Sequence, residues 1–129
     1  MSKNMELFNR GAALILAKLY DEFPNSIHLN IRELDDSMTE EEGKVYGSTL
    51  FFLRDEEFIR CGKSLNSGQM TSNVVLSSKG LEVLNSIPES ISGNISLGEK
   101  VKDVAISGTK ETLATVIQAV IGAAVSAGI

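Results

Sequence analysis

Apolar residues recur every three or four positions in several stretches of the chain, the spacing that gives a helix one buried face. Residues 5–22 carry such a stripe and stop before Pro24, which ends a helix. A second stripe runs over residues 39–57 and begins with Thr39 and Glu42, the spacing of a capping box. Both segments are therefore expected to be long helices.

Three shorter runs are typical of strands. "SIHLNI" (26–31) alternates apolar and polar residues, while "EFIRC" (57–61) and "NVVLS" (73–77) are rich in apolar residues. The segment between the last two, 62–72, is rich in turn formers and is too long for a two-residue hairpin turn. A short helix at 31–36, with room for about two turns, completes this part of the chain.

The pattern changes after the last predicted strand. Ser77 or Ser78 is expected to cap a further helix, which Pro88 ends. "PESISGNISLG" (88–98) combines Pro, Gly and Ser, a composition that predicts a hinge. We therefore expect a head at 1–88 that folds on its own, a hinge at 89–96 and a helical tail at 97–129.

The tail contains the longest uncharged stretch of the chain. Leu97, Val101 and Val104 share one face of a first helix, and Thr109 is a suitable N-cap for a second. Leu113–Ile129 is 17 residues without a charge. As a helix it would be about 25 Å long, a little short of the ~30 Å hydrocarbon core of a membrane.

A second subunit, lipid or the head itself would have to cover this apolar helix. Gln118 and the absence of trailing positive charges weaken the membrane interpretation. Gly122 and Ser126 are four residues apart, a spacing of small residues that lets helices pack closely. We favour a homo-oligomer in water. The residues assigned to oligomerisation are Leu113, Val116, Ile117, Val120, Ile121 and Gly122.

The order helix, strand, short helix, helix, strand, loop, strand, helix resembles a winged helix-turn-helix domain over residues 5–87. Two segments carry the resemblance, "TLFFLRDEEFIR" (49–60) and "VVLSSKGLEVLNSI" (74–87). The whole chain is also similar to small bacterial proteins with such a head and an apolar helical tail. The resemblance implies an α+β, mostly helical fold in which 62–72 is the wing of a small β-hairpin.

If DNA is bound, the resemblance places helix 39–57 in the major groove and the wing on phosphates or the minor groove. The implied contacts are Lys44, Ser48 and Arg54 on the helix and Arg60, Lys63, Asn66, Ser67 and Gln69 around the wing. Charge opposes this assignment. The net charge is −5, and the glutamates at 40–42 would repel phosphate, whereas nucleic-acid binders are usually basic.

The chain lacks the sequence patterns of catalysis and metal binding. It has no phosphate-binding Gly loop, no zinc-ligand spacing and no Ser/His/Asp arrangement, so no catalytic residue, metal ligand or cofactor is predicted. His28 is expected on the polar side of its strand. The single cysteine, Cys61, excludes an internal disulfide and suits a cytoplasmic, reducing location.

These observations favour a non-enzymatic cytoplasmic regulator of bacterial type. Each head would bind DNA weakly, and the tail would link several heads so that binding gains from avidity. The alternative is an adaptor whose acidic head docks on a protein and whose tail assembles subunits or contacts a membrane. A positive strip over helix 39–57 and the wing would support DNA binding, and an acidic or apolar strip would support docking.

Overall fold

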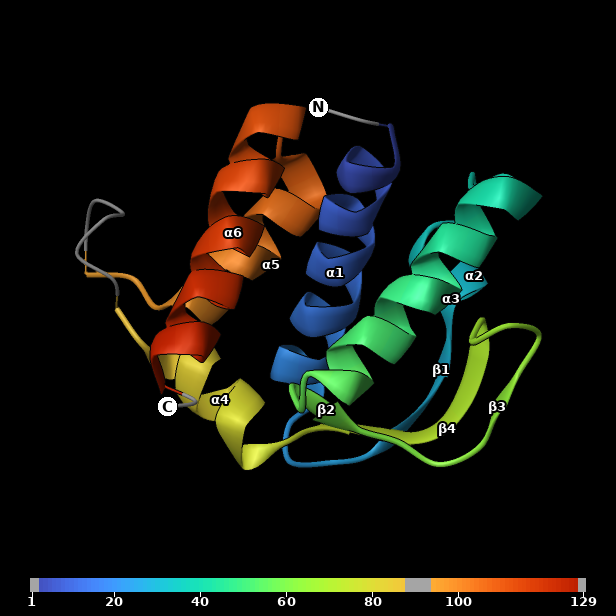
Figure 1. The fold of residues 1–129 in the computed structure, drawn as a ribbon, viewed down its shortest axis with the longest axis horizontal. Helices are drawn as coiled ribbons and strands as arrows, with labels where there is room; N and C mark the ends of the chain where they lie inside the picture. The colour runs from blue at the N-terminus through green and yellow to red at the C-terminus, as the bar shows by residue number, and fades with distance from the viewer. Residues whose placement is uncertain (1–2, 88–93, 128–129) are drawn as a thin grey trace.

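The computed structural model describes residues 3–87 and 94–127, so most of the predicted hinge lies outside the described residues. Within those two ranges the chain forms six helices and four short strands, which confirms the α+β, mostly helical class (Figure 1). The helices are α1 (Lys3–Glu22), α2 (Ile31–Leu34), α3 (Glu40–Asp55), α4 (Ser78–Asn85), α5 (Leu97–Ser107) and α6 (Lys110–Ala127). The strands are β1 (Ile27–Asn30), β2 (Ile59–Arg60), β3 (Ser64–Leu65) and β4 (Met70–Leu76).

Several helices begin where the sequence predicts, because polar side chains satisfy their first backbone amides. At α3 the amide of Glu42 donates to the Thr39 hydroxyl (3.2 Å) and the amide of Thr39 donates to the Glu42 carboxylate (2.8 Å). This is the predicted capping box. Ser77 caps α4. At α6 the amide of Thr112 donates to the Thr109 hydroxyl (3.2 Å), so Thr109 acts as the expected cap.

The strands form an antiparallel sheet in which β4 pairs with β1, β2 and β3. We call residues 59–76, from β2 to the end of β4, the hairpin. The sequence predicts a single loop at 62–72, but the structure places β3 and the start of β4 there. The hydroxyls of Ser64 and Thr71, paired across the two strands, are 2.8 Å apart. Such cross-strand hydrogen bonds cannot be read from composition, which explains the error.

Helix α1 is the centre of the molecule. It lies between α3 on one side and α5 with α6 on the other (Figure 1). Its buried residues include Ile15, Leu16 and Leu19, and one hydrophobic cluster joins them to Leu84 of α4 and Leu97 of α5. The head and the tail therefore share one core.

The apolar stripe of α6 packs against the head. Leu113, Val116, Ile117 and Val120 are each at most 6% exposed. Of the three covers considered, the head buries these four side chains within the single chain, so they need no second subunit to cover them; self-association stays a prediction. The turn at Gly108 brings α6 back along α5, so that its stripe meets α1 and α4.

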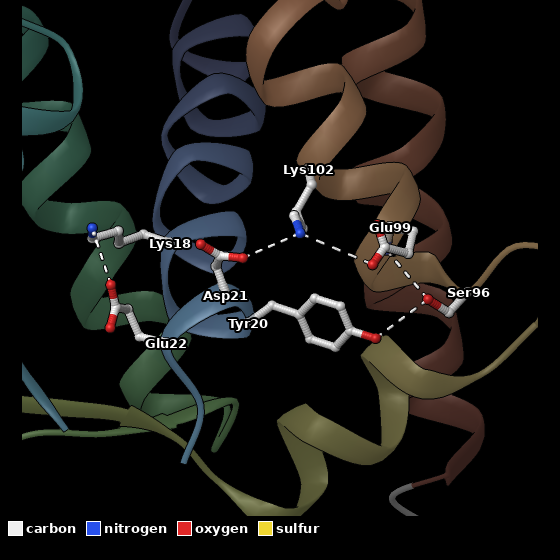
Figure 2. A network of polar contacts seen from close by, with 7 residues as sticks. All are labelled: Lys18, Tyr20, Asp21, Glu22, Ser96, Glu99 and Lys102. Carbon is white, nitrogen blue, oxygen red and sulfur yellow. Dashed lines mark hydrogen bonds and ion pairs between the residues drawn. The ribbon is translucent and has the colours of Figure 1, made fainter. Parts of the chain in front are cut away.

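Polar contacts join the tail to α1 at the edge of this core. Figure 2 shows Lys102 of α5 between two carboxylates, Asp21 of α1 at 3.2 Å and Glu99 at 4.0 Å. The hydrogen bond to Asp21 raises the pKa of Lys102. The Tyr20 hydroxyl lies 3.4 Å from the Ser96 hydroxyl, next to the start of α5. Exposed pairs of this kind contribute little to the stability of the fold. Apolar burial therefore supplies most of the free energy that keeps α5 on α1, and the polar contacts orient it.

A second polar cluster fixes the start of α3 against α1. The carboxylate of Asp35 accepts hydrogen bonds from the Ser37 hydroxyl (2.7 Å) and the Tyr46 hydroxyl (3.4 Å) and pairs with Arg10 of α1 (3.5 Å). Burial by itself raises the pKa of Asp35, but the bonds from Ser37 and the charge of Arg10 outweigh it and lower that pKa. Burial, followed by the charge of Asp35, raises the pKa of Tyr46 to about 12.

Candidate functional site

The outward face of α3 carries two of the predicted contact residues. Lys44 and Ser48 are exposed and one helical turn apart. Glu40 and Glu41, also exposed, precede them in the first turn of the helix. Carboxylates at this end are favourable for the helix because its N-terminus is partially positive. They also give the end nearest Lys44 a negative charge.

Arg54, the third predicted contact on α3, is engaged within the chain. Its Nε lies 2.9 Å from the Asp55 carboxylate, and its guanidinium lies over the Phe51 ring at 4.7 Å from the centroid. The hydrogen bond to Asp55 raises the pKa of Arg54. A partner that takes up this guanidinium must first compete with a neighbouring carboxylate.

The hairpin presents four of the five predicted wing residues on its surface. Arg60, Lys63, Asn66 and Ser67 are all exposed. Asn66 and Ser67 have left-handed backbones, with φ of 54° and 55°, and Gly68 follows with φ of 87°. Three successive left-handed residues turn the chain sharply and leave the Asn66 side chain at the tip.

Gln69 is the exception, and the structure corrects its predicted role. Its side chain is only 3% exposed, so it cannot reach a base edge or a phosphate. Its backbone carbonyl accepts the amide of Ile31 (2.9 Å), which ties the hairpin to α2. Among the described residues, its side-chain Oε1 has no hydrogen-bond partner. Gln69 therefore acts as a packing residue beneath the hairpin turn.

Two glycines of α3 that the sequence analysis missed allow this arrangement. A Cβ on Gly43 would lie 2.7 Å from Oε1 of Gln69, and a Cβ on Gly47 would collide with the backbone carbonyl of Ser67. Gly43 and Gly47 are four residues apart and so share one side of α3. The spacing is visible in the sequence, but only the fold shows that the hairpin turn occupies that side.

The two elements together do not form a basic surface. Residues 40–69 contain six acidic and four basic side chains. Arg54 is paired with Asp55, and Lys44 is next to the acidic first turn of the helix. Arg60 and Lys63 remain as exposed cations of the hairpin. Acidic side chains therefore outnumber basic ones over α3 and the first part of the hairpin.

The remaining predicted oligomerisation residues have separate environments. Ile121 is half-buried, and Gly122 is exposed with no atom within 4 Å of the position where its Cβ would stand. Val125, one turn further on, is 63% exposed. Of the six residues assigned to oligomerisation, Gly122 is the one that is exposed, and Val125 extends this outer edge of α6.

The reactive side chains have ordinary surroundings. His28 is exposed on β1, as expected. Burial raises the pKa of the Cys61 thiol, and the charge of Arg54 opposes that shift only in part. A raised pKa disfavours the reactive thiolate. Within residues 3–87 and 94–127, no three His, Cys, Asp or Glu side chains are grouped closely enough to hold a metal ion.

Comparisons with protein-family models, with curated proteins and with solved structures found no match to this chain. In the part of the chain that the structure describes, none of the helices has both the length and the apolar character needed to cross a membrane.

Proposed function

We propose that residues 5–87 are a winged helix-turn-helix domain that docks on a partner protein, and that the chain is a non-enzymatic adaptor. The order of the helices and strands supports the winged-helix assignment, as does a sheet in which β4 lies between β1 and β2. One observation carries the docking function. The exposed face of α3 begins with Glu40 and Glu41 and ends with Asp55, so it suits a basic protein surface better than a phosphate backbone.

DNA binding is the second candidate, and the exposed cations of the hairpin favour it. Arg60, Lys63 and, on α3, Lys44 are exposed, and exposed cations are the usual side chains that contact phosphates. Each phosphate contact releases counterions, so binding through these residues must weaken steeply as salt rises. In that case the acidic first turn of α3 would lie near the DNA major groove, where its carboxylates would repel the phosphates.

A titration of labelled random-sequence DNA at two salt concentrations separates the two functions. If the chain docks on protein, DNA binding should be undetectable near physiological salt. If it binds DNA, replacing Arg60 and Lys63 together by Ala should weaken binding to every sequence and lower the salt slope by about one to two units. Tight binding by the unaltered chain would overturn the docking proposal.

A photo-crosslinking residue tests docking directly. Placed at Ser48 on α3, it should capture a protein in an extract of the cells that express the chain, and nuclease treatment should not reduce the yield. The matched control is the same residue at Glu82, an exposed position on a different helix, α4. Equal capture from both positions, or loss of the Ser48 product with nuclease, would contradict docking through α3.

Self-association is proposed only for the outer edge of α6. Gly122 and Val125 are exposed there, and small residues let a second helix approach closely. Replacing Gly122 by Leu should therefore lower the mass measured by light scattering if the chain is an oligomer. The substituted side chain meets open space in the single chain, so its folding should be preserved.

A further inference from the structure

A pocket of about 260 Å³ lies where α1, α3 and the turn between α5 and α6 meet. Helices α1 and α6 begin at this same end of the molecule (Figure 1). Leu7 and Leu113 supply its apolar lining, and Leu113 is only 6% exposed. The other lining residues are Lys3, Glu6, Arg10, Glu42, Gly108 and Lys110. None of them belongs to the exposed face of α3 or to the hairpin.

Most of the charges around this pocket are already committed. Lys110 of α6 pairs with Glu6 of α1 at 3.5 Å, which joins the two helices across one wall. Arg10 shares its charge with Asp35, also at 3.5 Å. These pairs link neighbouring elements around the pocket, but exposed pairs of this kind stabilise little, so the pocket walls are held mainly by the apolar core.

Two opposite charges are left for a ligand. In the described residues, no hydrogen bond or ion pair engages the ammonium of Lys3. On α3, one carboxylate oxygen of Glu42 accepts a hydrogen bond from the amide of Thr39 at 2.8 Å. Within the described residues, the second oxygen of Glu42 has no hydrogen-bond or ion-pair partner. The pocket thus offers a cation, a carboxylate oxygen and an apolar floor. A ligand that satisfies all three carries a carboxylate, an ammonium and an apolar group.

We propose that this pocket binds a small apolar amino acid. The ligand carboxylate would lie at the ammonium of Lys3, its own ammonium at the second oxygen of Glu42, and its side chain on Leu7 and Leu113. A pocket of about 260 Å³ restricts the ligand to a small molecule, and leucine and valine are amino acids of this kind with an apolar side chain. The inference does not depend on the docking function, because no residue of the proposed interface lines the pocket.

Three compounds of one carbon skeleton test the charge pattern: leucine, 4-methylpentanoate without the amine, and 3-methylbutylamine without the carboxylate. We expect leucine to shift the amide resonances of Leu7, Gly108 and Leu113 in a ¹H–¹⁵N titration, with roughly millimolar affinity. Each of the other compounds should bind at least about fivefold more weakly. Equal binding of all three, shifts confined to other residues, or no shift up to about 50 mM leucine would overturn the proposal.

Two single substitutions locate the contacts. Lys3→Gln removes the cation at an exposed position. Glu42→Gln removes the carboxylate but keeps the capping box, because glutamine serves equally well at that position. Each should weaken leucine binding by about fivefold or more, while the control Lys44→Gln, on α3 but outside the pocket, should leave it unchanged. If either pocket variant binds leucine as tightly as the unaltered chain, the assigned contacts are wrong.

Discussion

At the scale of single residues, two glycines of α3 decide where the hairpin lies. Gly43 and Gly47 leave one side of the helix without side chains, and the turn from Ser67 to Gln69 fills that space. At Gly47 the nearest atom to an added methyl group is a backbone carbonyl oxygen rather than the end of a flexible side chain. The hairpin would have to move away from α3 to accept it.

Gly47→Ala should therefore destabilise the fold by about 1–3 kcal/mol, the usual cost of overpacking. Gly122→Ala is the matched control. It also adds a methyl group to a helix, but in open space, so it should raise stability by up to about 1 kcal/mol. Urea unfolding followed by circular dichroism measures both. A stabilised Gly47→Ala variant would show that the turn does not rest on α3.

The second prediction at this scale concerns Asp35 and the pH dependence of folding stability. Burial opposes its charge, but the bonds from Ser37 and the charge of Arg10 lower its pKa below the ordinary 3.8. A carboxyl whose pKa is lower in the folded chain stabilises the fold above its unfolded pKa, and that contribution is lost as pH falls through the folded pKa. Asp35→Asn should thus reduce stability at neutral pH and make much less difference in strong acid.

Urea unfolding of the unaltered chain and the Asp35→Asn variant, from about pH 7 downwards, checks this dependence. Asp36→Asn, which removes a charge from the exposed neighbouring residue, controls for the change in net charge. A difference between the unaltered chain and Asp35→Asn that stays constant down to strong acid would mean that the Asp35 charge does not stabilise the fold.

At the scale of elements, helix α6 has apolar residues that either the head of the same chain or a second subunit could cover. Its buried face includes Ile117, 1% exposed, and its outer edge includes Val125, 63% exposed. Periodicity identifies both sides of the helix but not the surface that covers them. Helix α6 covers the head of its own chain. Changes to its buried face should therefore lower folding stability and not only affect assembly.

Ile117→Ala should cost about 2–5 kcal/mol of unfolding free energy, because it leaves a cavity in the shared core. Val125→Ala, on the exposed edge, should change stability by less than about 0.5 kcal/mol. The loss at Ile117 should be the same at tenfold lower protein concentration, since contacts within one chain do not follow mass action. A loss that grows on dilution would instead place Ile117 between subunits.

At the scale of the whole molecule, the head and the tail share one hydrophobic core around α1. Independent folding of the head stays a prediction. Because the tail packs on the head, removing the tail exposes apolar surface and should lower the stability of the head. A chain ending at Ile87 loses α5 and α6, which cover faces of α1 and α4. Exposed apolar area costs roughly 25 cal/mol per Å². The shortened chain should therefore unfold at a clearly lower urea concentration than the full chain, and equal midpoints would show that the tail adds no stability.

Local chemistry let the sequence predict most of the elements. Thr39 and Glu42 satisfy each other's backbone amides three residues apart, and Ser77 caps the next helix within one turn. Both events depend only on neighbours in the chain. The faces of α1 and α5 follow from their 3.6-residue period in the same way. The α+β class and the exposure of Lys44, Ser48, Arg60 and Lys63 could therefore be expected from the sequence.

The tertiary structure alone decided what each face meets. Burial of Gln69 depends on a hairpin turn that packs against glycines at least twenty residues earlier, and no local pattern encodes that approach. The pocket of Lys3, Glu42 and Leu113 joins three segments distant in sequence. Likewise, an apolar stripe on α6 gains similar free energy from a second subunit or from its own head, because hydrophobic burial is not directional. The turn at Gly108 directs α6 back onto the head, so the stripe of α6 is buried against α1 and α4 of the same chain.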